Sequence, residues 1–172
     1  MDRGRVEGPE DPGAAAPAPG VVRGARWLAL LAGLVFLGGA VWKLADWHYH
    51  VEVLGAYGVL DFLPAGLLAA GSLVLEIALA VLMLLPRTWM RGLQAAAAFL
   101  VFTAAILAWE TLAGGGGDCG CLPFFTRYIG WGAVGQNLAA ALFLGSLGVL
   151  GSLDGEQREG ARQAADERDT GS

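Results

Sequence analysis

The sequence is poor in cysteine and in charged residues, and each shortage excludes a class of protein. Two cysteines in 172 residues cannot build a disulfide scaffold. Charged residues make up only 16% of the chain, the formal net charge is −5, and no basic cluster of the kind that binds nucleic acid is present. We therefore expect no nucleic-acid partner.

Apolar residues dominate the composition instead. They make up 55% of the sequence, and the mean hydropathy of +0.53 lies outside the usual range of soluble domains. Four apolar runs each match or exceed the roughly 20 residues that a helix needs to cross a bilayer. The sequence thus predicts an all-α membrane protein, a four-transmembrane-helix bundle in contact with the lipid bilayer. The expected spans are residues 27–45, 64–85, 93–112 and 129–153.

The two ends of the chain differ from the expected membrane domain at residues 23–153. Residues 1–22 are rich in Pro, Gly, Ala and charge, and residues 154–172 are rich in charge, so we expect disordered, mobile tails. A cleaved signal peptide is the alternative for the first apolar run, because Arg23 and Arg26 precede it. That run is long for a signal peptide, and no small-residue cleavage site follows it.

The distribution of Lys and Arg predicts the orientation of the four spans. One face of the expected bundle carries most of the basic residues, and the positive-inside rule makes it cytoplasmic, with both termini inside. These residues are Arg23, Arg26, Arg87, Arg91 and Arg158, against Lys43 and Arg127 at the other face. The segments 46–61 and 114–127 then lie outside the inner (plasma) membrane, where disulfides form and persist.

Both cysteines lie in one short motif, Asp118-Cys119-Gly120-Cys121, which follows a run of four glycines. A disulfide between residues two positions apart closes a small, strained ring, and strained, exposed disulfides are easily reduced. Gly120 suits the backbone of such a ring. We expect Cys119 and Cys121 to form a redox pair, with Asp118 and Gly120 as its motif context. A structural brace and half of a copper or zinc site are the alternatives.

Several polar side chains are expected inside the membrane or at its edge. Glu76 lies near the middle of the second span, so it is either a functional residue or a protonated acid that is hydrogen-bonded inside the bundle. Lys43 and Glu110 lie at the outer ends of their spans and are expected to form an interfacial ion pair. Asn137, beside Gln136, is expected to form hydrogen bonds between helices.

The stretch between the first two spans, residues 46–61, is polar and aromatic, and it predicts an interfacial loop or a short helix in the headgroup region. In an extended chain four of its side chains would share one face and resemble a metal cluster: Asp46, His48, His50 and Glu52. Their spacing matches no known metal site. We therefore expect hydrated side chains there and predict neither a metal nor another cofactor.

Five features of the chain match one family. They are Lys43-Leu-x-Asp46 at the end of the first span, Leu75-Glu76 in the second, Phe102-Thr-Ala-Ala in the third, the Asp118-Cys-Gly-Cys121 motif, and Trp131 with Asn137-Leu138 in the fourth. Over about residues 27 to 150 the chain resembles the methylamine utilisation protein MauE, within the wider MauE/DoxX group of small four-span membrane proteins. The cysteine motif is the specific part of this resemblance.

The resemblance implies a role in maturing a periplasmic, disulfide-rich client, the small subunit of methylamine dehydrogenase, alongside a thioredoxin-like partner, MauD. Leu122-Pro123 and Gln136 depart from the family pattern of Phe-Gly and a basic residue, and these changes concern the client more than the fold. We expect a membrane redox accessory that assists thiol–disulfide exchange and is not a stand-alone enzyme. The alternatives are a small-solute carrier or channel component that depends on Glu76, and a non-catalytic scaffold for a thioredoxin-like partner.

Overall fold

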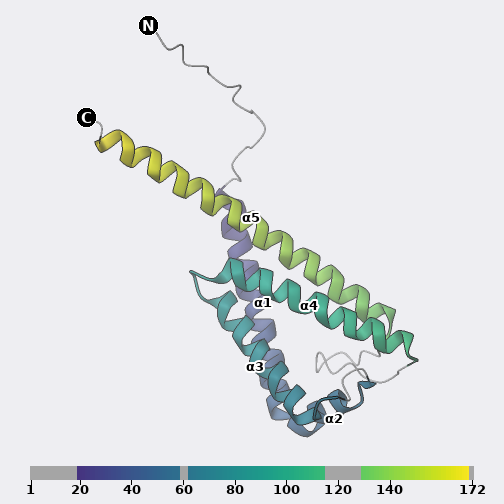
Figure 1. Cartoon of the computed structure of the whole chain (residues 1–172). Helices are drawn as coiled ribbons and strands as arrows, with labels where there is room; N and C mark the ends of the chain where they lie inside the picture. The colour runs from purple at the N-terminus through teal and green to yellow at the C-terminus, as the bar shows by residue number, and fades with distance from the viewer. Residues whose placement is uncertain (1–18, 59–61, 115–128, 171–172) are drawn as a thin grey trace.

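The computed structural model describes residues 19–58, 62–114 and 129–170. Within these ranges the protein has five helices and no strand (Figure 1): α1 (Pro19–Ala45), α2 (Trp47–Gly55), α3 (Ala65–Leu84), α4 (Trp89–Leu112) and α5 (Trp131–Thr170). Four of the helices in this part of the chain are long and apolar enough to cross a membrane. The predicted all-α, four-span fold is confirmed.

The apolar parts of these helices lie close to the expected spans. They are Val22–Ala45, Ala65–Leu84, Trp89–Leu112 and Trp131–Leu153. The first and third begin a few residues earlier than expected, because the helices continue past Arg26 and Arg91. A long arginine side chain near the end of a span can carry its charge toward the interface, so it does not interrupt the helix.

Helical structure also extends beyond two expected boundaries. Helix α1 begins at Pro19, since proline is tolerated in the first helical turn, where its missing N–H has no partner to lose. Helix α5 continues to Thr170, so the stretch 154–170, which we expected to be a mobile tail, is helical. That stretch contains Glu, Gln, Arg and Ala, which favour helix, and no proline. Residues 1–18 lie outside the described part of the chain.

The stretch between the first two spans contains the short helix α2, one of the two forms expected for it. The Asp46 side chain caps this helix by accepting a hydrogen bond from the backbone N of Tyr49, at 3.4 Å. The cap satisfies one of the N–H groups that a helix start leaves without a partner. Helix α2 packs mainly against α3.

The long helices form two antiparallel pairs, α1 with α3 and α4 with α5, and the pairs meet at the turn between α3 and α4 (Figure 1). At this end Arg26 donates hydrogen bonds to the carbonyl oxygens of Met83 (2.7 Å) and Leu84 (2.6 Å). The guanidinium thereby satisfies carbonyl groups at the C-terminus of α3 and lies 5.9 Å from the centroid of the Trp89 ring. Arg26 thus ties α1 to the α3–α4 turn.

A buried apolar cluster fills this end of the bundle. It combines residues of α1, α3, α4 and α5: Ala25, Ala29, Leu79, Met83, Trp89, Leu93, Ala96 and Leu144. A second cluster lies toward the other end and joins α2 to α4 and α5: Val53, Tyr57, Ala104, Leu107, Ala133 and Val134. The two helix pairs are therefore packed directly together near the α3–α4 turn, and at the other end the stretch that contains α2 connects to α4 and α5.

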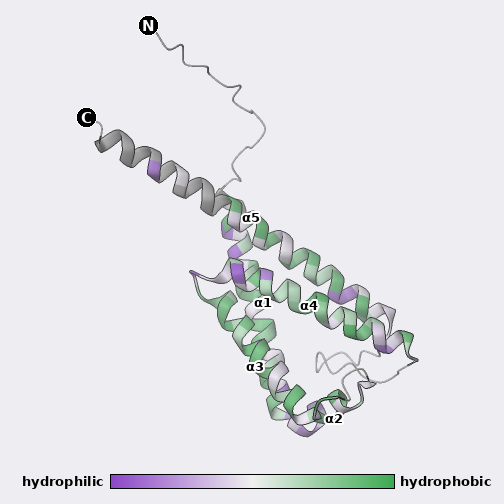
Figure 2. Ribbon diagram, viewed as in Figure 1, coloured by the Kyte–Doolittle hydropathy of each residue, from purple (hydrophilic) through white to green (hydrophobic). Residues whose placement is uncertain are grey.

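Hydrophobic residues also cover the outside of the four spans (Figure 2). Large apolar side chains such as Leu34, Val74, Val101 and Leu142 are at least half exposed. Such a surface is costly in water but matches hydrocarbon. The outer faces of the helices therefore suit contact with lipid.

The close approach of α3 and α4 predicts a specific loss of stability in Gly92→Ala. The added methyl group would lie 2.7 Å from the backbone N of Met83 and 2.8 Å from the backbone carbonyl carbon of Leu82. Backbone atoms cannot rotate away, so we expect the free energy of unfolding to fall by about 1–3 kcal/mol. Thermal unfolding in detergent measures the change.

Gly38→Ala is the matched control, because a Cβ at Gly38 meets no atom within 4 Å. Because alanine has a higher helix propensity than glycine, the stability of this variant should be unchanged or slightly raised. Equal stability of the two variants would contradict the packing at Gly92.

Candidate functional site

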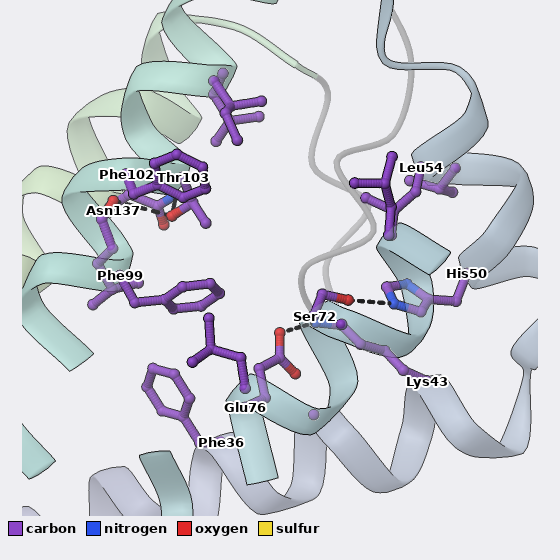
Figure 3. A pocket seen from close by; sticks show the side chains of 18 of the residues that line it. Phe36, Lys43, His50, Leu54, Ser72, Glu76, Phe99, Phe102, Thr103 and Asn137 are labelled. Atoms are coloured by element: carbon purple, nitrogen blue, oxygen red, sulfur yellow. Dashed lines mark hydrogen bonds and ion pairs between the residues drawn. The ribbon is translucent and has the colours of Figure 1, made fainter. Parts of the chain in front are cut away.

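A cavity of about 810 Å³ lies between the two helix pairs. All five helices contribute to its walls, which are mostly aliphatic and aromatic. The described residues of the lining that carry polar groups are Lys43, His50, Tyr57, Ser72, Glu76, Thr103, Gln136 and Asn137. Figure 3 shows Lys43, His50 and Ser72 on one side of the open space, with Phe99, Thr103 and Asn137 on the other. A large apolar cavity with a few converging polar groups is the usual form of a small-molecule site.

Lys43 and Glu76 form a buried ion pair in the wall of this cavity. Lys43 comes from the last turn of α1 and is 9% exposed; Glu76 comes from the middle of α3 and is 8% exposed. Two buried charges of opposite sign avoid the large cost of leaving either one unpaired in an apolar environment. The pair links α1 to α3 and adds no net charge to the cavity.

This pairing corrects the prediction for Lys43. We expected its side chain to extend to the interface and to pair with Glu110, but the structure turns it inward onto Glu76. The reason is the packing of α1 against α3, which places Lys43 beside the one acidic residue of that span. Glu110 itself is 5% exposed and lies near the end of α4.

His50 of α2 also faces the cavity. Its Nε2 lies 3.0 Å from Ser72 Oγ, and Ser72 Oγ donates its own hydrogen to the carbonyl oxygen of Ala69, also at 3.0 Å. The hydrogen between His50 and Ser72 therefore belongs to Nε2, which donates to the serine. Because the histidine is the donor, it cannot act as a base toward Ser72, and the pair is not an activated nucleophile.

The pKa of His50 is lowered from 6.5 to about 4, first by burial and then by the nearby Lys43 charge, while a hydrogen bond to the Ala69 backbone acts in the opposite direction. His50 is 6% exposed, whereas His48 and Glu52 point to the surface. In a helix, residues two positions apart point to different sides. Asp46, His48, His50 and Glu52 therefore do not share one face, as they would in an extended chain. Among the described residues, no group of three potential ligands can hold a metal ion.

Asn137 of α5 and Thr103 of α4 connect the second helix pair. Asn137 Nδ2 donates to Thr103 Oγ1 at 3.3 Å, and Thr103 Oγ1 donates to the carbonyl oxygen of Leu100 at 3.0 Å. This confirms the expected hydrogen bond between helices. The neighbouring Gln136 also lines the cavity, and its side chain is exposed.

The cysteine motif lies outside the described residues. Asp118, Cys119, Gly120 and Cys121 belong to the segment 115–128, so their role as a redox pair stays a prediction. The ends of the flanking helices are described: α4 ends at Leu112 and α5 begins at Trp131. Both ends lie on the side of the bundle away from the α3–α4 turn (Figure 1).

The sequence interpretation missed Ser72 and the cavity itself. One signal was available, because Ser72 and Glu76 are four residues apart and so share one face of α3 with the buried Ala69 and Leu79. Two polar residues on the buried face of an apolar span indicate polar partners on a neighbouring helix. The identity of those partners, Lys43 and His50, depends on how α1 and α2 pack.

The buried ion pair predicts strong coupling between Lys43 and Glu76. Lys43→Met leaves the carboxylate without its partner, and Glu76→Gln leaves the ammonium without its own. Each single change should lower the free energy of unfolding by about 3–5 kcal/mol. The double variant should lose less than the sum of the two. Thermal unfolding of the four proteins in detergent measures the coupling, and additive losses would contradict the pair.

The buried His50 predicts a pH dependence of stability. Between pH 6.5 and about 4 the unfolded chain binds a proton at His50 that the folded protein does not. Stability should therefore fall as the pH is lowered through this range. His50→Gln, which keeps a donor toward Ser72, should weaken this fall, whereas His48→Gln at the surface should not. Melting temperatures measured between pH 7 and pH 4 test this, and identical pH profiles for the two variants would contradict it.

Comparisons with known proteins complete the description of the site. No curated protein and no solved structure matches the chain. One family model, described as Methylamine utilisation protein MauE, matches residues 22–152, which is more than half of the chain. The match includes the first three candidate spans, the fourth span except Leu153, and the cysteine motif. The chain therefore belongs to the MauE family of methylamine utilisation proteins and is a multi-pass membrane protein.

Proposed function

We propose that the protein is a membrane redox accessory that uses Cys119 and Cys121 as a thiol/disulfide pair outside the cytoplasm. One observation carries the proposal: the only two cysteines of the sequence stand one residue apart, in the segment that joins α4 to α5. Family membership supports a role in methylamine utilisation. The client is then a disulfide-containing periplasmic protein, such as the small subunit of methylamine dehydrogenase.

The distribution of basic residues supports this orientation in the inner membrane. Arg26 bonds to the end of α3, beside the turn that carries Arg87 and Arg91, so these arginines lie at one end of the bundle. The positive-inside rule makes that end cytoplasmic. The segment between α4 and α5 joins the opposite ends of its helices and would face the oxidising side, where a disulfide can persist.

The proposed chemistry is an exchange between a dithiol and a disulfide. A thiolate of one pair attacks a sulfur of the other pair's disulfide, and the displaced sulfur leaves as a thiolate that takes up a proton. The second thiol of the attacking pair then attacks the mixed disulfide and releases the partner as a dithiol. Two electrons and two protons pass between the pairs. Cys119 and Cys121 form one of the two pairs, and a thioredoxin-like, MauD-like protein supplies the other.

A carrier or channel component for small solutes is the second candidate. The cavity and the buried ion pair of Lys43 and Glu76 favour it, because ionisable residues within a span often mark a solute path. In that case the cysteines would only brace the outer segment, and Glu76 would be essential. A scaffold that recruits its partner without chemistry would need neither.

Trapping of mixed disulfides tests the redox proposal. In Cys119→Ser or Cys121→Ser the remaining thiol can attack a partner, but no second thiol releases it. We expect at least one variant to form a covalent adduct with a thioredoxin-like protein or a client on non-reducing gels. The double variant should form none and should lower the yield of correctly disulfide-bonded client several-fold.

Glu76→Gln separates the candidates. Under the redox proposal this variant, once corrected for its expression level, still permits trapping at the remaining thiol. A carrier would lose function in Glu76→Gln and keep it in both cysteine variants. If neither cysteine variant traps a partner and the double variant keeps full client yield, the redox proposal is wrong. A partner that still co-purifies with the double variant, without any loss of client yield, would identify a scaffold.

A further inference from the structure

The cavity between the helix pairs is large enough to hold a ligand. Thiol exchange at the cysteine motif does not by itself require one. Its volume of about 810 Å³ is partly open to the surroundings and is lined by residues of all five helices. Small-molecule sites in proteins occupy roughly 300–1,000 Å³, so the cavity is at the large end of that range. Its walls are mainly apolar, which suits a molecule that dissolves in the bilayer.

The charges that the described residues contribute to the cavity lining sum to zero. Lys43 and Glu76 neutralise each other, and His50 is uncharged at neutral pH because burial lowers its pKa to about 4. An ammonium ion or a carboxylate entering the cavity would therefore meet no unbalanced charge of opposite sign. The desolvation cost of a charged ligand would not be offset, so the cavity favours an uncharged one.

Hydrogen-bond donors lie on opposite sides of the open space (Figure 3). The Lys43 ammonium has three N–H groups, and Glu76 accepts from it on one side. Across the cavity the Asn137 amide has two N–H groups, of which Thr103 accepts one. Each wall thus offers a donor that already has a fixed position and retains a further hydrogen. Such donors match a ligand with hydrogen-bond acceptors on two opposite edges.

Aromatic rings complete the recognition surface. Phe36 of α1 and Phe99 of α4 both line the cavity, with ring centroids 6.3 Å apart and planes inclined at 58°. Phe102 lies further along the same wall as Phe99 (Figure 3). Aromatic faces favour flat, unsaturated rings through offset or edge-to-face contacts. The remaining aliphatic lining provides room for an apolar chain.

We infer that this cavity binds an uncharged, lipid-soluble molecule with a flat ring and carbonyl oxygens on opposite edges, which is the chemistry of a membrane quinone. Lys43 and Asn137 donate to the two carbonyl oxygens, the phenylalanines contact the ring, and the aliphatic wall contacts the tail. This binding does not depend on the cysteines. A site filled only by lipid acyl chains, or only by another part of this chain, is distinguished from it below.

Binding of a radiolabelled, decyl-substituted benzoquinone to the full-length protein in nanodiscs tests the inference, with empty nanodiscs as the correction for partitioning into lipid. We expect saturable binding. Decylbenzene, which has the ring and the tail but no carbonyl groups, should compete at least about tenfold more weakly, since two hydrogen bonds of ordinary strength are lost. Decylammonium and decanoate should not compete.

Two matched pairs of variants locate the site. Gly71 lines the cavity and Gly66 does not, although both lie in α3 and a Cβ at either position meets no atom within 4 Å. Gly71→Leu should abolish saturable binding, and Gly66→Leu should preserve it. On α5, Asn137→Ala should weaken binding about tenfold, whereas Ser146→Ala, outside the cavity lining, should leave it unchanged.

Three results would overturn the inference: equal competition by decylbenzene, which indicates a site for acyl chains only; equal binding in the two glycine variants; or no saturable binding at all, which indicates a cavity already filled by another part of this chain. Unchanged affinity in Asn137→Ala would overturn the contact assigned to that residue. The variant with both cysteines replaced by serine should bind the quinone normally. A failed trapping experiment with intact quinone binding would therefore refute the redox proposal alone.

Discussion

The buried ion pair between Lys43 and Glu76 is the interaction on which the rest of the bundle depends. A lone charge in the interior of a membrane protein costs several kcal/mol, so each of these residues requires the other. Their pairing fixes the end of α1 against the middle of α3. Helix α2 follows α1 directly, and His50 then reaches Ser72 on the same face of α3. Three elements of the chain are thereby connected through one polar face.

The second helix pair is held by different means. Helices α4 and α5 pack closely where Gly148 and Gly151 leave room for Met90, Gln94 and Trp89, and the hydrogen bond from Asn137 to Thr103 adds a polar link. The two pairs meet at the α3–α4 turn, where Gly92 brings the helix backbones together. Between them lies a cavity with fixed polar groups on both sides, to which the described residues contribute no net charge. Its neutrality is a consequence of the ion pair.

Much of the fold was predictable because the bilayer imposes simple requirements on a chain. Every backbone polar group must be paired within the span, so long apolar runs become helices, and Pro86 stops the second of them. The bond made by Asn137 was predictable for a similar reason, since a polar side chain in a span needs a partner on another helix. The partner of Lys43 was not predictable, because position along a span does not reveal which way a helix is rotated about its axis.

The sequence by itself determined the number, length and approximate limits of the spans, the family, and the motif in which both cysteines stand. Hydrophobicity and spacing are local properties, and they act within one segment of chain. Only the tertiary structure decided that Lys43 meets Glu76, that His50 points inward while His48 points outward, and that these groups surround one cavity. These contacts join residues 22 to 33 positions apart, and they follow from the packing of whole helices.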